Sequence, residues 1–198
     1  MTLKFAPRAL AAALLIGLSA CSQPTGLLNV ATSPAEDRSF DSLKSDTQIT
    51  LDINEVLLGE KYRDLFFNIS TDVYEGRVML TGRVKYPQNL QRATDLVRGI
   101  KGVRDIYNDM QVAKEYTVGE QATDLWIETK LKAELIGTEG VHSINYRWRS
   151  VRGVVSLIGT ARTQAELDKV LDVIRRTDRV KKVINHAWVR LAKAAGKS

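Results

Sequence analysis

The only cysteine of the chain, Cys21, lies where its thiol could be acylated. Two basic residues, Lys4 and Arg8, are followed by an apolar run from Ala9 to Leu18 and by the small residues Ser19 and Ala20. This order is typical of a removable signal peptide. An apolar run of about ten residues is too short for a transmembrane helix, which needs about 20. The sequence therefore predicts cleavage near Cys21 and no membrane span in this region.

The segment Leu18-Ser-Ala-Cys21 resembles the lipobox of bacterial lipoproteins, in which the cysteine is diacylated and the chain is cut before it. We expect residues 1–20 to be a lipoprotein signal peptide and Cys21 to be the lipidation site. Two or three acyl chains form a stable anchor, at about 0.8 kcal/mol per buried methylene. By resemblance to Gram-negative lipoproteins, Ser22 implies sorting to the outer membrane, facing the periplasm. The alternative is a plain secretory signal with a stray cysteine.

Other residue types that could do chemistry form no recognisable site. The two histidines, His142 and His186, lie in separate segments, without cysteines or clustered carboxylates at metal-ligand spacing. The sequence contains no nucleophile elbow, P-loop or dinucleotide-binding motif. We therefore predict a protein that is not an enzyme and that uses no metal or cofactor. We also predict no nucleic-acid partner, because an exported chain does not meet nucleic acid.

The remainder of the chain is an internal repeat. Gly76-Arg-Val-Met-Leu-Thr-Gly82 aligns with Gly153-Val-Val-Ser-Leu-Ile-Gly159 at an offset of 77 residues, and the same offset aligns residues 102–108 with 179–185. We define copy one as residues 44–114 and copy two as residues 120–192. Residues 21–43, rich in Ser, Thr, Pro and Asp, read as a flexible tether, and residues 193–198 as a basic tail.

Each copy has the same order of predicted elements. Apolar residues spaced by four, at 49, 53 and 57 and at 127, 131 and 135, predict a helix that ends at Gly59 or Gly137. Two alternating runs joined by Glu75-Gly76 or Arg152-Gly153 predict a hairpin. A second helix and a closing strand follow. The predicted fold is α+β, with each copy an αββαβ unit whose three-stranded mixed sheet packs on two helices.

This order, with its Gly-x-Val-x-Leu-x-Gly strand and a late Gly-Val-x-x-Ile-x-Asn at residues 102–108, resembles the BON domain of bacterial envelope proteins. Asp124-Leu-Trp-Ile-Glu-Thr-Lys130 is similar to the first-helix motif of second BON domains. The resemblance implies a non-enzymatic protein that binds anionic phospholipid through this helix and supports outer-membrane integrity. The chain departs from the pattern in the Arg- and Trp-rich segment 141–152 and at Arg179, which replaces the glycine found at Gly102.

A helical wheel for the helix expected from Asp124 gives an independent reason to expect a binding face in copy two. Its core stripe is centred on Ile127, Leu131 and Leu135, and large apolar side chains remain on the far side, where copy one is mostly polar. The predicted phospholipid-binding residues are Leu125, Trp126, Thr129, Lys130, Lys132, Ala133 and Ile136.

Charge separates the two copies in the same way. Residues 46–113 contain nine Lys and Arg against ten Asp and Glu, whereas residues 122–193 contain fourteen against eight, a net of +6. Arg147, Arg149 and Arg152 are candidates for a basic rim. Basic residues near an anionic surface contribute about 1 kcal/mol each, and Trp prefers the membrane interface. The expected partner is an anionic, phosphatidylglycerol-like membrane surface.

Other interpretations remain open. Trp126 could instead form the contact between the copies, or bind a protein of the division or outer-membrane assembly machinery, which would make the chain a periplasmic adaptor. Trp148 and Trp188 fall on predicted strands and are expected to pack on the sheet, although Trp148, beside Arg147 and Arg149, could instead be a rim contact. The cluster of Arg and Lys at residues 175–182 could be an ordinary solvated helix end.

Overall fold

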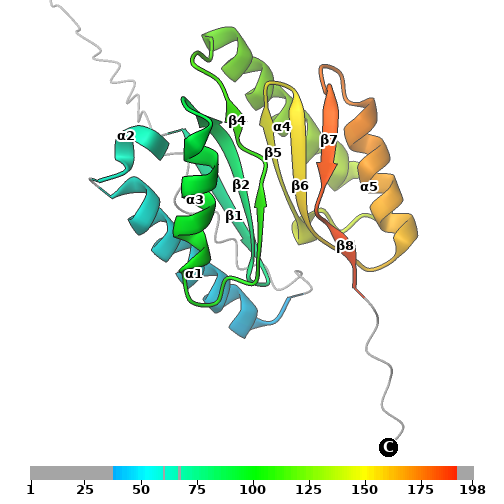
Figure 1. The fold of residues 1–198 in the computed structure, drawn as a ribbon. Coiled ribbons are helices and arrows are strands. Elements are labelled where there is room, and N and C mark those ends of the chain that lie inside the picture. Colours follow the sequence, from blue (N-terminus) through cyan, green and yellow to red (C-terminus); the bar gives the residue numbers. More distant parts are fainter. Residues whose placement is uncertain (1–37, 60, 67, 191–198) are drawn as a thin grey trace, which may run out of the picture.

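The computed structural model describes residues 38–59, 61–66 and 68–190, and of residues 64 and 65 the backbone alone. The predicted signal peptide, Cys21, most of the tether and the basic tail lie outside the described residues. The two copies form two α+β domains, as predicted. The helices of each copy lie on the side of its sheet that is turned away from the other copy (Figure 1).

Each copy follows the predicted order, with one extra helical turn in copy one. Copy one consists of α1 (Phe40–Leu58), α2 (Arg63–Phe66), β1 (Ile69–Tyr74), β2 (Arg77–Val84), α3 (Gln88–Arg98), β3 (Asp105–Asn108) and β4 (Gln111–Val112). Copy two consists of α4 (Val118–Gly137), a 3-10 turn η1 (Ser143–Asn145), β5 (Tyr146–Val151), β6 (Val154–Ala161), α5 (Gln164–Arg176), β7 (Lys182–Asn185) and β8 (Trp188–Val189).

The second strand is central in each sheet. β2 pairs antiparallel with β1 and parallel with β3, and β6 pairs in the same way with β5 and β7. The predicted closing strand is interrupted, because the side chain of Asn108 or Asn185 accepts a hydrogen bond from the backbone N–H two residues later. β4 and β8 then resume the pairing with the end of the central strand. The predicted hairpin turns form at Glu75 and Arg152, both with positive φ.

Both first helices begin earlier than the sequence prediction placed them. Ser39 caps α1, so the helix begins at Phe40, inside the segment assigned to the tether. Thr117 and Glu120 form a reciprocal capping box, so α4 begins at Val118 instead of Asp124. Thr163 caps α5 by accepting from the N–H of Glu166, and the carboxylate of Glu166 accepts from the N–H groups of Arg162 and His142.

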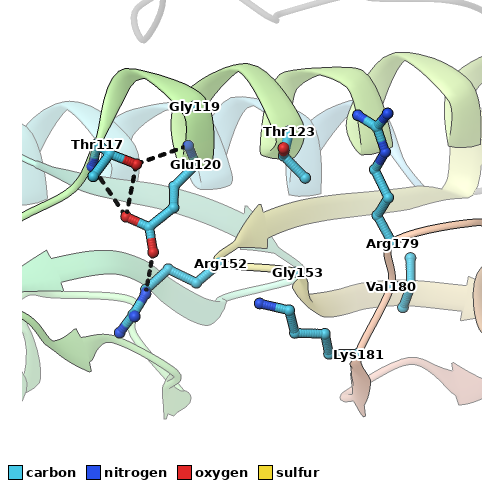
Figure 2. Close-up of a pocket in the computed structure, with 9 residues that line it drawn as sticks. All are labelled: Thr117, Gly119, Glu120, Thr123, Arg152, Gly153, Arg179, Val180 and Lys181. Carbon is cyan, nitrogen blue, oxygen red and sulfur yellow. Dashed lines mark hydrogen bonds and ion pairs between the residues drawn. The ribbon is translucent and has the colours of Figure 1, made fainter.

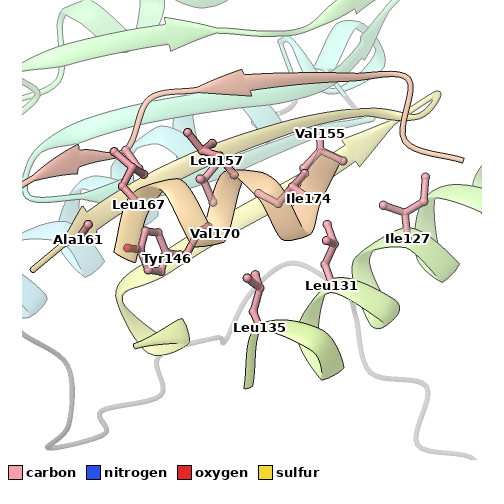
Figure 3. Close-up of a cluster of buried hydrophobic side chains, with 12 residues drawn as sticks. Ile127, Leu131, Leu135, Tyr146, Val155, Leu157, Ala161, Leu167, Val170 and Ile174 are labelled. Atoms are coloured by element: carbon pink, nitrogen blue, oxygen red, sulfur yellow. The ribbon is translucent and has the colours of Figure 1, made fainter. Parts of the chain in front are cut away.

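The core of copy two lies between its helices and its sheet, as Figure 3 shows. The stripe predicted from the spacing of four, Ile127, Leu131 and Leu135, is 0% exposed. It meets the inward-facing side chains of β6 and α5, among them Leu157 and Ile174. Fully burying a side chain of this size contributes about 1.5–3 kcal/mol. Copy one repeats the arrangement with Ile49, Ile53 and Leu57.

The outward faces of the two sheets pack against each other. Tyr74, Met79 and Ile158 are fully buried between them. Trp188 closes this small cluster with an edge-to-face contact on Tyr74, at 5.7 Å between ring centroids. The guanidinium of Arg77 covers the Trp188 ring at 3.6 Å. Trp188 therefore packs on its sheet as predicted, and its contacts belong to the interface between the copies.

Two polar pairs in this interface join equivalent positions of the repeat. The guanidinium of Arg149 donates to both carboxylate oxygens of Asp72, at 2.8 and 3.1 Å, across a separation of 77 residues. His186 and Asp109 are also 77 residues apart and lie 2.8 Å from each other, with the His186 ring stacked on Tyr107. Each residue of these pairs therefore contacts its own equivalent.

Two further contacts are exchanged between the copies. Tyr74 packs on Trp188, and Gln111 donates to the carbonyl of Val151 at 2.8 Å. Val151 and Trp188 follow Tyr74 and Gln111 by 77 residues. When residue i contacts j and their equivalents contact in the reverse order, the interface is isologous. The copies are thus docked like the two subunits of a twofold dimer.

Candidate functional site

The exposed side of α4 carries large apolar side chains that the core of copy two does not use. Leu125 is 67% exposed, Ile136 is 64% exposed and Trp126 is 36% exposed. We call this surface the α4 outer face and define it by the residues that the sequence predicted, all of which are exposed: Leu125, Trp126, Thr129, Lys130, Lys132, Ala133 and Ile136.

Trp126 lies away from the interface between the copies. Its ring is covered by the guanidinium of Arg179, 4.8 Å from the ring centroid, within copy two. The tryptophan that joins the copies is Trp188. Trp148, in contrast, packs on the core of copy two and donates its indole N–H to the carbonyl of Glu128. The prediction that Trp148 packs on the sheet is therefore confirmed.

Asp124 fixes α4 against the β5–β6 hairpin. Its buried carboxylate accepts from the N–H groups of Arg152 at 2.6 Å and Gly153 at 2.9 Å and from the Ser150 hydroxyl at 2.6 Å. Tyr116 donates a fourth hydrogen bond. Burial, together with this bond to a carboxylate, raises the pKa of the Tyr116 hydroxyl. Copy one repeats the contact, since Asp46 accepts from the N–H groups at residues 75 and 76.

A groove of about 440 Å³ runs along one side of the α4 outer face. Leu125 and Ile136 lie along its helical wall, and Trp148 lies on the opposite wall, from β5. Glu128 is placed between these walls, where it accepts from the N–H of Ser150. Burial raises the pKa of the Glu128 carboxyl, and the bond from Ser150 opposes that change.

The three arginines of the predicted basic rim lie at two places, because Arg147 and Arg149 line the groove and Arg152 does not. Arg147 lines the groove and donates to the carbonyls of Ile144 and Tyr146. Arg149 is committed to Asp72, whose charge raises the pKa of the guanidinium. Its side chain also lines the groove and is 32% exposed, so its place in the basic rim stays a prediction. Side chains alternate along β5, so Arg147 and Arg149 lie on the same face of this strand and Trp148 on the other.

Arg152 lies on the other side of α4, in a second pocket of about 600 Å³ (Figure 2). Its guanidinium donates to Glu120 at 2.9 Å. Arg179 and Lys181 line the same pocket, and Thr123 lies above them on α4. The sequence leaves open whether the cluster 175–182 is an ordinary solvated helix end. Part of it behaves in that way, since Arg176 pairs with Asp172 on the surface of α5.

The α4 outer face thus has a groove on one side and a basic pocket on the other. Leu125, Thr129, Lys132 and Ile136 border the groove, whereas Trp126 reaches the pocket through its contact with Arg179. Within the described ranges, His, Cys, Asp and Glu do not gather in groups of three that could hold a metal ion. The arrangement can hold an apolar or anionic surface against α4.

Two αββαβ units docked through their sheets, one with an apolar and basic helix face, define a tandem α+β repeat protein. The chain belongs to the BON domain family, which it matches over residues 45–114 and 123–190. The two matched segments coincide with the two copies of the repeat, and the resemblance drawn from the sequence is confirmed.

Curated relatives agree with this assignment. The chain is 34% identical over 149 residues to a protein in the gshII 5′ region of Anaplasma centrale, covering 75% of this chain and 97% of that one. It is 31% identical over 111 residues to the outer membrane lipoprotein DolP of Haemophilus influenzae, covering 56% and 57%. It is 28% identical over 143 residues to the osmotically-inducible protein Y of Escherichia coli, covering 71% and 70%.

Proposed function

We propose that this protein is a non-enzymatic, lipid-anchored periplasmic protein that binds anionic phospholipid through the α4 outer face and supports the integrity of the outer membrane. The observation that carries the proposal is the exposure of Leu125, Trp126 and Ile136 on one helix face, beside basic side chains. Apolar side chains enter the headgroup region of a bilayer, and lysines and arginines add attraction to anionic lipids.

The difference between the copies supports placing the lipid contact in copy two. The first helices align at an offset of 78 residues, as Asp46 and Asp124 show, so the residue of α1 equivalent to Trp126 is Gln48, which bonds to Asp52 at the surface. Leu51 and Leu58 of α1 are exposed as well, but no tryptophan accompanies them. Copy one therefore serves to orient copy two, through the sheet interface.

The lipobox and the relatives support the proposed location at the outer membrane. A Haemophilus influenzae relative is named an outer membrane lipoprotein. Among the residues that the structure describes, none of the helices combines the length and the apolar character of a transmembrane span. An anchor at Cys21 would hold the chain on the membrane, so that α4 acts at the periplasmic surface.

Replacing Cys21 by alanine tests the anchor. We expect a soluble or uncleaved protein that no longer sediments with outer membrane, because no acyl chains are attached. Cell fractionation and mass spectrometry of the mature chain measure this. A mature protein that begins at another residue and carries no lipid would contradict the proposed anchor.

Replacing Trp126 by glutamate tests the lipid contact. We expect at least a tenfold loss of binding to phosphatidylglycerol-containing vesicles, because an interfacial anchor is removed and a carboxylate faces anionic headgroups. The fold should persist, since Trp126 lies outside the core, whereas truncating a core Leu costs about 2–5 kcal/mol. Co-sedimentation of the 22–198 chain, which contains all described residues, gives the binding, and thermal unfolding reports the fold.

Leu51→Glu is the matched control, because it also replaces an exposed apolar side chain by glutamate, on the exposed face of α1. It should bind vesicles nearly as well as the unmodified chain. Equal losses for both variants would mean that the effect is general electrostatic repulsion. Unfolding of the Trp126→Glu variant would mean that Trp126 is structural and would leave the binding face to be sought near Arg147.

The alternative function is a periplasmic adaptor of the division or outer-membrane assembly machinery that uses the same helix face. The groove beside α4 favours it, since about 440 Å³ could receive side chains of a bound peptide. The two functions differ in salt dependence. Binding to anionic vesicles weakens at high ionic strength, because exposed charges are screened within about 8–10 Å, whereas an apolar peptide groove should be nearly indifferent to salt.

A further inference from the structure

The pocket in Figure 2 has an excess of positive charge that its own carboxylate does not neutralise. Three cations, Arg152, Arg179 and Lys181, line it beside one acid, Glu120, which binds Arg152. Within the described part of the chain, neither Arg179 nor Lys181 forms an ion pair. Figure 2 shows Arg179 extending toward α4 and Lys181 extending beneath it, with the Thr123 hydroxyl on the helix above.

The equivalent positions in copy one carry no such excess. The residues that correspond to Arg152, Arg179 and Lys181 at the offset of 77 are Glu75, Gly102 and Arg104, whose charges cancel. Glu75 is also bound by Arg190 of copy two. The two copies share the hairpin turn, the buried aspartate and the core, so the cations are an addition to copy two, the copy that carries Trp126.

The backbone of Arg179 has a left-handed conformation, which favours glycine. Its φ is +68°, and the equivalent Gly102 has a φ of +94°. A residue other than glycine costs free energy at positive φ. Backbone conformations of this kind are frequent at functional sites. The guanidinium, moreover, is held over the exposed Trp126 ring. A guanidinium carries five N–H donors, so a contact with an aromatic ring leaves donors available for an anion.

We propose that this pocket binds the phosphate of an anionic phospholipid headgroup, with Arg179 and Lys181 as its ligands. The inference rests on the proposed function, because a Trp126 ring at the membrane interface brings Arg179 to the depth of the headgroups. Arginine can bind two phosphate oxygens at once, and lysine adds a compact charge. We take the occupant to be a lipid and not a free anion, because Arg179 contacts the exposed Trp126 ring, so a headgroup ligand lies beside an apolar surface for an acyl chain.

Arg179→Gly in the 22–198 chain tests the proposal, because glycine suits the positive φ and removes only the side chain. We expect about a fivefold loss of affinity for vesicles of phosphatidylglycerol and phosphatidylcholine, the effect of one cation at an anionic surface. The double variant with Lys181→Gln should lose about 25-fold if the two cations act independently. The Tm should stay within about 3 °C of that of the unmodified chain.

The control is Arg98→Ala, which removes the same charge from an exposed helix end in copy one and should change the affinity less than twofold. Equal losses for Arg98→Ala and Arg179→Gly would overturn the proposal, since net charge alone would explain them. Unchanged binding of Arg179→Gly, with binding still lost in Trp126→Glu, would overturn the proposal and leave the proposed function intact. If inorganic phosphate binds the chain and Arg179→Gly abolishes that binding while vesicle affinity is unchanged, the pocket is a site for the free anion and the proposal is overturned.

Discussion

Replacement of Asp124 by alanine is expected to destabilise copy two by at least about 3 kcal/mol, because its buried donors lose their acceptor at about 1–3 kcal/mol each. These are the N–H groups of Arg152 and Gly153 and the hydroxyl of Ser150. The loss also frees the α4 N-terminal half from the hairpin. For a chain of this size we expect the Tm to fall by at least about 6 °C. Thermal unfolding of the 22–198 chain measures it.

Asp168→Ala provides the comparison for this loss. Asp168 also accepts a side-chain hydrogen bond, from Gln164, but both residues lie at the surface of α5. Its replacement should cost less than about 0.5 kcal/mol, as exposed substitutions usually do. If both variants unfold at the same temperature, the carboxylate of Asp124 does not hold the helix to the hairpin. The Asp124 side chain does not contact lipid in the proposed function. Any loss of vesicle binding in the Asp124 variant should therefore come from the displacement of α4.

Much of the fold could be predicted because it follows from local periodicities of the sequence. The spacing of four in Ile127, Leu131 and Leu135 and the alternation along β5 and β6 each reflect one buried face. The start of α4 was missed, although Thr117 and Glu120 have the spacing of a capping box. Gly119 is a weak helix former, so the sequence gives little indication of the first turn. The interruption of the closing strand at Asn185 depends on one side-chain hydrogen bond and has no periodic signal.

The α4 outer face could be identified on the sequence because a helical wheel needs only the pitch of the helix. The partners of Arg149 and Trp188 could not be identified from the sequence, since Asp72 and Tyr74 are far away in the chain. The sequence does contain one signal of this docking. Asp72 and Arg149 occupy equivalent positions of the repeat with opposite charge, as twofold docking would require.

The two sides of α4 suggest how one helix could bind a membrane in a defined orientation. Trp126 and the pocket cations are on one side, and the apolar wall of the groove is on the other. The hairpin that carries Arg152 is tied to the helix by Asp124. A rigid link of this kind lowers the entropy lost when several side chains engage one surface together. Copy one contributes by holding β5 through Arg149.

Reversal of the Arg149 charge is expected to separate the two copies. In Arg149→Asp, the carboxylate of Asp72, 8% exposed, would lose its bidentate partner and face a second carboxylate. Breaking a buried pair in this way costs about 3–5 kcal/mol. We expect a lower Tm, a larger radius of gyration by small-angle X-ray scattering and faster proteolysis of residues 113–117, which join the copies. The core of each copy is untouched, so its secondary structure should remain.

The exchanged variant, Asp72→Arg with Arg149→Asp, decides whether the pair itself holds the copies together. Its side chains regain opposite charges across the interface, and we expect it to recover more than half of the lost stability. Recovery should be incomplete, because Glu128 lies 3.9 Å from Arg149 and would then face the new carboxylate. If Arg149→Asp alone leaves the Tm and the scattering unchanged, the apolar cluster around Tyr74 and Trp188 suffices for docking. The pair would then serve only to exclude the pairing of two identical copies, in which Asp72 would meet another Asp72.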